Sequence, residues 1–137
     1  MSNPGANTTF TFSPPIDSHY LIELYAGDYV MIGETFTDVL LEYDVFVEHI
    51  EAGYEQDDRT SLKSAVHKIK PLFGFVGLLT LQAECQQFEN SCLQADAGAL
   101  ASNFNSLKDK LLKVRGLIES EKDRLLQFIS ASPARLG

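Results

Sequence analysis

Apolar residues recur three and four positions apart along most of the chain, which is the spacing of amphipathic helices. Strand-like alternation of apolar and polar residues is short and rare. Glycines interrupt the pattern at four places, Gly27, Gly53, Gly77 and Gly98. The sequence therefore predicts an all-α fold.

Capping residues and glycines divide this pattern into five helices. Asp17 and Asp28 are predicted N-caps of the first two helices, and Asp57 or Asp58 of the third. The expected ranges are about 17–25, 28–52, 58–76, 78–94 and 98–129. Because short connections join long amphipathic helices, sequence neighbours should run antiparallel. We expect an antiparallel four-helix bundle with a short additional N-terminal helix.

The length of 137 residues fits one compact domain, and 45% hydrophobic with 22% charged residues is an ordinary globular balance. We expect the bundle domain to span residues 16–130. Residues 1–15 are rich in Ser, Asn, Thr, Gly and Pro and are predicted to be a disordered lead-in. Residues 131–137 are expected to form a loose tail.

Several classes of function are excluded. No apolar run approaches the ~20 residues that cross a bilayer, and the first residues do not form a secretory signal. The net charge of −8 argues against nucleic acid as a partner. Cys85 and Cys92 would lie about 10 Å apart on one helix, too far for a disulfide, and they fit no zinc spacing. We interpret them as buried reduced thiols, which favours a cytoplasmic location.

The charge is divided unevenly along the chain. Residues 1–58 hold 12 of the 19 acids and no Lys or Arg, whereas residues 59–137 hold all 11 bases with 7 acids. The segment from 59 to 77 carries four cations and no acid: Arg59, Lys63, Lys68 and Lys70. This segment should therefore attract an acidic partner in a salt-dependent way.

The candidate chemistry lies on the third expected helix. Five apolar residues fall within about 40° of one line and predict its buried face: Leu62, Val66, Ile69, Phe73 and Val76. His67 lies about 140° from that line, on the solvent side, with Lys70 one turn further along. An exposed ring nitrogen can accept a phosphoryl group while Lys70 balances the added charge. The alternative is an ordinary surface histidine, which is our interpretation of His19 and His49.

The run from Ala65 to Leu78 resembles the phosphorylation-site helix of histidine-containing phosphotransfer (HPt) domains of bacterial phosphorelays. It contains the histidine, a lysine three residues later, and Gly77 at the position of a further family glycine. The resemblance extends in coarser form from about Ile16 to Phe128.

This resemblance implies that His67 takes a phosphoryl group from the aspartate of a receiver domain and relays it to another response regulator. The partners would be receiver domains of response regulators and hybrid sensor histidine kinases. Magnesium belongs to the receiver, so no metal or cofactor of its own is implied. The chain shows no nucleotide-binding loop, so it would have no ATP-dependent kinase activity. We expect a cytoplasmic monomer.

The match to the family is less direct at two positions, Pro71 and Glu89. Pro71 stands where the family most often has glycine and cannot donate to the carbonyl of His67, so we expect a bend rather than a stop. Gapless matching puts Glu89 where the family often has a glutamine or other polar residue that binds the ring. A carboxylate there would hold the Nδ1–H tautomer and leave Nε2 free. The alternative for Glu89 is an ordinary surface residue.

The resemblance also suggests a docking surface around the histidine. Its candidate residues are Lys63, Lys68, Pro71, Gly74 and Phe75, with Pro71 and Gly74 leaving room for a partner. Phe75 would either offer an apolar contact or pack under the neighbouring helix. The rival hypothesis is a helical scaffold that binds receivers without phosphotransfer. A metal- or cofactor-binding bundle is a weaker third hypothesis, since three dispersed histidines supply no ligand cluster.

Overall fold

The computed structural model describes residues 9–131, and within that range the chain forms helices and connecting segments with no strand. The prediction of an all-α fold is confirmed. The five helices are α1 Ser18–Leu24, α2 Tyr29–Glu55, α3 Arg59–Phe75, α4 Leu79–Ser91 and α5 Ala97–Ser130.

Aspartate side chains fix where most of the helices begin. Asp17, Asp28 and Asp58 each accept a hydrogen bond from the backbone N–H three residues on, as expected of N-caps. Asp96 caps α5 in the same way, so this helix begins slightly earlier than its glycine predicted. Helix α4 has no such cap and follows Gly77, whose φ of +74° is in the left-handed region that favours glycine.

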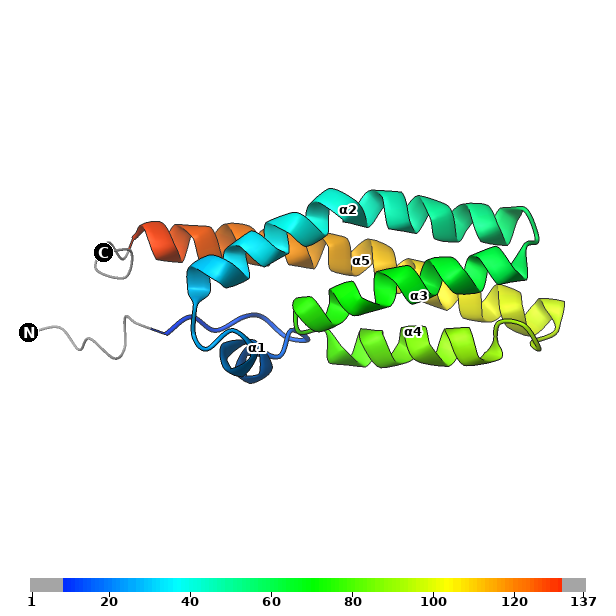
Figure 1. Cartoon of the computed structure of the whole chain (residues 1–137), viewed down its shortest axis with the longest axis horizontal. Helices are drawn as coiled ribbons and strands as arrows, with labels where there is room; N and C mark the ends of the chain where they lie inside the picture. Colours follow the sequence, from blue (N-terminus) through cyan, green and yellow to red (C-terminus); the bar gives the residue numbers. More distant parts are fainter. Residues whose placement is uncertain (1–8, 132–137) are drawn as a thin grey trace, which may run out of the picture.

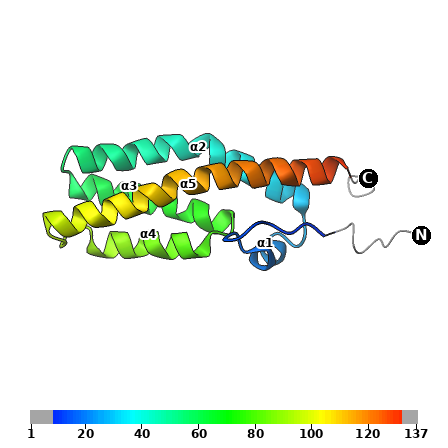
Figure 2. The same cartoon turned by 180° about the vertical axis from the view of Figure 1, so that it is seen from behind.

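The helices assemble into an elongated bundle (Figure 1). α2, α3, α4 and α5 lie along its long axis, and α3, α4 and α5 each turn back at the end of the helix before. α2 packs on α3 and α5, and α4 packs chiefly on α3. The view from behind (Figure 2) shows that α2 and α5 extend beyond α3 and α4, with α1 near that end.

The core runs through the middle of the bundle and takes residues from each helix. Phe36, Tyr43, Ile69 and Leu111 are among the side chains with almost no exposure. The Tyr43 hydroxyl donates to the carbonyl of Leu111 at 2.6 Å, so α2 and α5 are also joined by a polar contact. Burial raises the pKa of Tyr43, which keeps this donor protonated.

The N-terminal segment departs from the expectation of disorder. The described part of it, residues 9–15, holds Phe10 at 5% and Phe12 at 2% exposure in the core. The Phe12 ring stacks on Phe36 with 5.4 Å between centroids, and Phe10 packs against Phe128 at 5.4 Å. The expectation was wrong here because two aromatic side chains outweigh a polar, proline-containing composition. Residues 1–8 and 132–137 lie outside the described part.

A buried carboxylate on α5 holds this segment in place. Glu121 is 4% exposed and accepts from the backbone N–H of Ser13 at 2.6 Å and from its hydroxyl at 3.1 Å. Arg124 pairs with Glu121 at 2.9 Å and donates to the carbonyl of Thr11 at 2.6 Å. Burial alone would raise the pKa of Glu121, but the hydrogen bonds from Arg124 and Ser13 outweigh it and lower the pKa.

Candidate functional site

Helix α3 places His67 on the outside of the bundle. Its buried residues, including Leu62, Val66, Ile69 and Phe73, face the core. The His67 side chain is 66% exposed on the opposite side, as predicted from the spacing. The helix continues past Pro71 to Phe75, so the proline does not stop it.

Glu89 on α4 reaches the ring of His67 from the interior. Its Oε1 lies 2.8 Å from His67 Nδ1, and the residue is only 5% exposed. A carboxylate accepts hydrogen bonds and does not donate them, so Nδ1 carries a proton, and in the neutral ring Nε2 has a free lone pair. The alternative that Glu89 is an ordinary surface residue is wrong, because the packing of α4 on α3 buries it beside the ring.

Lys70 completes a compact group with His67 and Glu89. Its Nζ lies 2.8 Å from Glu89 Oε2 and 3.5 Å from His67 Nδ1, and its side chain is 17% exposed. The contact with Oε2 is an ion pair that is not aligned as a hydrogen bond. A cation beside the buried carboxylate offsets the cost of removing that charge from water.

The connection from α3 to α4 sets the position of Glu89. Only residues 76–78 separate the two helices, and Gly77 turns the chain there with its positive φ. A Cβ on Gly77 would lie 2.9 Å from Cγ of Leu21, so α1 also packs closely on this turn. Since the turn is short and tightly packed, it fixes which face of α4 meets His67.

Three of the predicted docking residues line one groove beside the site. Pro71, Gly74 and Phe75 border an open groove of about 700 Å³ formed with α1 and α2. Phe75 is 48% exposed, which favours the first of the two interpretations given for it. Gly74 is buried, and a Cβ there would lie 2.7 Å from the amide of Gln82, so it does not leave open space beside His67.

The other wall of this groove was not predicted from the sequence. Leu24 of α1 and Met31, Asp38 and Glu42 of α2 line it, and Leu24 and Met31 are about half exposed. The α2 residues recur at helical spacing away from the core line, a signal that was available in the sequence. Their meeting with α3 depends on tertiary packing and could not be read from one helix.

The cations of α3 have different surroundings. Arg59 donates to the carbonyls of Cys92 and Ala95 at the far end of α4, and Lys70 pairs with Glu89. Lys63 is half-buried and Lys68 is exposed, and neither has an acidic partner in the part of the chain that the structure covers. The unneutralised positive charge therefore lies on the same helix as His67.

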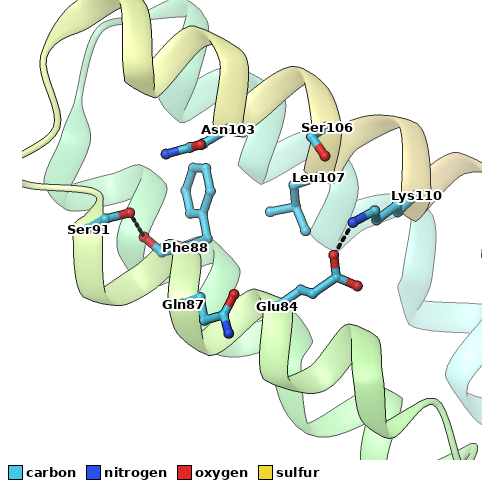
Figure 3. A pocket seen from close by; sticks show the side chains of 8 residues that line it. All are labelled: Glu84, Gln87, Phe88, Ser91, Asn103, Ser106, Leu107 and Lys110. Carbon is cyan, nitrogen blue, oxygen red and sulfur yellow. Dashed lines mark hydrogen bonds and ion pairs between the residues drawn. The ribbon is translucent and has the colours of Figure 1, made fainter.

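A second pocket lies between α4 and α5 and belongs to a different face (Figure 3). It measures about 330 Å³, and its lining from α4 consists of Glu84, Gln87, Phe88 and Ser91. Lys110 of α5 pairs with Glu84 across it. None of the histidine-site residues lines this pocket.

Among residues 9–131, the geometry does not support metal binding or thiol chemistry. No three His, Cys, Asp or Glu side chains gather there as metal ligands. Cys85 and Cys92 are free and buried, and burial raises the pKa of the Cys85 thiol to about 12, which keeps it unreactive. No helix of the described range combines the length and apolar character that a membrane span requires.

Comparison with known proteins assigns the family. The family model for the Hpt domain matches residues 34–127, which include all of α3 and α4 and most of α2 and α5. Searches of curated proteins and of solved structures gave no significant match. The matched region contains His67, Lys70 and Glu89, and it spans more than half of the chain. The chain therefore belongs to the Hpt domain family.

Proposed function

We propose that His67 accepts a phosphoryl group from the phosphoaspartate of a receiver domain and passes it to the aspartate of another. The observation that carries the proposal is the exposed ring of His67, whose Nδ1 is bound at 2.8 Å by the buried carboxylate of Glu89. This contact supports Nε2 as the nucleophile, since Nε2 keeps its lone pair and faces away from the carboxylate.

The proposed transfer needs no proton movement at the attacking nitrogen. The Nε2 lone pair forms a bond to phosphorus while the bond from phosphorus to the aspartate oxygen breaks, and the aspartate leaves as a carboxylate. The Nδ1 proton stays hydrogen-bonded to Glu89, and Lys70 supplies positive charge beside the phosphorylated ring. Transfer onward reverses these steps, so the ring leaves as neutral imidazole.

The proposal extends to the fold and to the setting of the protein. It includes the antiparallel four-helix arrangement with an additional N-terminal helix, which the course of the helices in Figure 1 supports. It includes a cytoplasmic monomer without a metal or cofactor of its own. The partners are receiver domains, which would dock on Lys63, Lys68, Pro71 and Phe75 and along the groove that the buried Gly74 borders.

The proposal is tested by exposing the protein to a receiver carrying labelled phosphoaspartate. Wild-type protein should gain label that is acid-labile and base-stable, as expected of phosphohistidine, and His67→Gln should gain none. His49→Gln is a matched control, since His49 is an exposed histidine on α2. Label that persists in His67→Gln, or never appears on the wild type, would defeat the proposal; binding without label would favour a scaffold.

A further inference from the structure

Gln86 on α4 contacts the ammonium of Lys70 directly. Its Oε1 accepts from Lys70 Nζ at 2.6 Å, while its Nε2 donates to Oδ1 of Asn90 at 2.8 Å. The amide nitrogen can only donate and the amide oxygen can only accept, so both ends of the side chain are used. Asn90 thereby sets the orientation of the Gln86 amide toward Lys70.

The spacing of these residues puts them on one side of α4. Gln86, Glu89 and Asn90 are separated by three and four positions, so they lie on adjacent turns. Gln86 and Glu89 bind the Lys70 ammonium from two directions, at 2.6 and 2.8 Å. A free lysine side chain samples many rotamers, and these two contacts select the one that brings Nζ within 3.5 Å of His67 Nδ1.

The two ligands of Lys70 differ in what else they do. Glu89 also binds the ring of His67, so its removal would disturb both the imidazole and the lysine. Gln86 binds Lys70 and Asn90, and among the described residues its side chain makes no hydrogen bond to the ring. Its effect on the reaction would therefore pass through the lysine alone.

We propose, on the basis of the function proposed above, that Gln86 is a positioning residue for Lys70 and that Asn90 orients it. The Gln86 amide keeps the ammonium beside the imidazole before the phosphoryl group arrives. The lysine then does not have to be ordered during transfer, when ordering it would slow the reaction. Gln86 itself makes no hydrogen bond to the ring of His67.

A double-mutant comparison tests this role. Initial rates of label transfer from a phosphorylated receiver are measured for wild type, Gln86→Ala, Lys70→Ala and the double variant. Gln86→Ala should slow transfer by roughly three- to ten-fold. This corresponds to part of the free energy that a hydrogen bond to a charged group contributes. In the Lys70→Ala background the same substitution should have no further effect. The control is Gln87→Ala, which removes a neighbouring amide on the pocket side of α4 and should leave the rate unchanged.

Three outcomes would overturn the proposal: an unchanged rate in Gln86→Ala, an equal slowing in both backgrounds, or the same slowing in Gln87→Ala. An NMR signal from the Lys70 ammonium gives a second readout that does not depend on transfer. Hydrogen exchange at that ammonium should be faster in Gln86→Ala than in wild type, and equal exchange would contradict the contact. Absence of label on wild-type protein would defeat the proposed function and the role of Gln86 in it. The NMR measurement would still test the contact between Gln86 and Lys70.

Discussion

His67 owes its expected reactivity to a residue on another helix. Its exposure follows from its place opposite the buried face of α3, and this was predicted from spacing alone. The hydrogen bond from Nδ1 to Glu89 could be suggested only by family resemblance, because 22 residues separate the partners. Gln86 carried no signal in the sequence, since its role depends on where the Lys70 side chain ends.

Two substitutions of Glu89 should distinguish the effect of its charge on label transfer from the effect of its hydrogen bond to His67. Glu89→Leu removes the acceptor of His67 Nδ1 and the partner of Lys70, and we expect label transfer to slow roughly ten-fold or more. Glu89→Gln keeps an acceptor oxygen and should lose less. The measurement is the rate of label transfer, with circular dichroism as a check that the helices remain. Equal rates in Glu89→Leu and wild type would remove the assigned role.

Glu121 should make stability depend on pH. Its pKa in the folded protein is below its ordinary value of 4.5, so the charged form stabilises the fold above that value. This contribution is lost as pH falls through the folded-state pKa. Glu121→Gln should therefore lower the free energy of unfolding by about 1–3 kcal/mol at neutral pH. Urea unfolding should show the difference shrinking as the pH falls below 4.5, whereas a difference that grows in acid would contradict this sign.

At the scale of the helices, the first residue of each helix was predicted more accurately than the last. The aspartate caps of α1, α2 and α3 are local signals, and the helices begin where those residues stand. Helix α4 was expected to reach residue 94 but ends at Ser91. The following turn is bound by Arg59, which donates to the carbonyls of Cys92 and Ala95. A contact across 33 residues of sequence leaves no local pattern.

The crossing of α2 and α3 depends on a glycine. A Cβ on Gly53 would lie 2.9 Å from both the backbone nitrogen and Cα of Leu62, and a backbone cannot move aside as a flexible side chain can. We expect Gly53→Ala to destabilise the protein by about 1–3 kcal/mol, measured by urea unfolding. Gly116→Ala is the matched control. It lies within α5 with no atom near its Cβ position, and it should stabilise by about 0.5–1 kcal/mol. Similar effects of the two substitutions would contradict the close approach.

At the scale of the whole molecule, two features differ from what the sequence suggested: the extent of the folded unit and the charge around His67. The folded unit begins before the matched region, since Phe10 and Phe12 enter the core while the family match starts at residue 34. The net charge of −8 does not describe the face around His67. Lys63 and Lys68 are left without acidic partners in the described range, whereas cations of α5 such as Lys108 and Arg115 pair with acids of α2.

This distribution predicts salt-dependent docking. Lys68→Glu should lower the rate of label transfer roughly three-fold at low ionic strength, because it reverses a charge on the helix that would meet an acidic receiver. The difference should shrink in high salt, where exposed charges are screened. Lys113→Glu makes the same change in net charge on α5, where Lys113 pairs with Asp109, and should have little effect. Equal effects of the two substitutions would show that only total charge matters.

The exposure of the His67 ring bears on how long a phosphoryl group could stay there. With 66% of its side chain exposed on the outside of a helix, phosphorylated His67 would stand in open water between partners. Because no segment of residues 9–131 encloses the ring, water would be excluded only while a receiver covers the site. The lifetime of the stored group would then be set mainly by phosphohistidine chemistry in solvent. Signal would be lost whenever the next receiver arrives later than that lifetime.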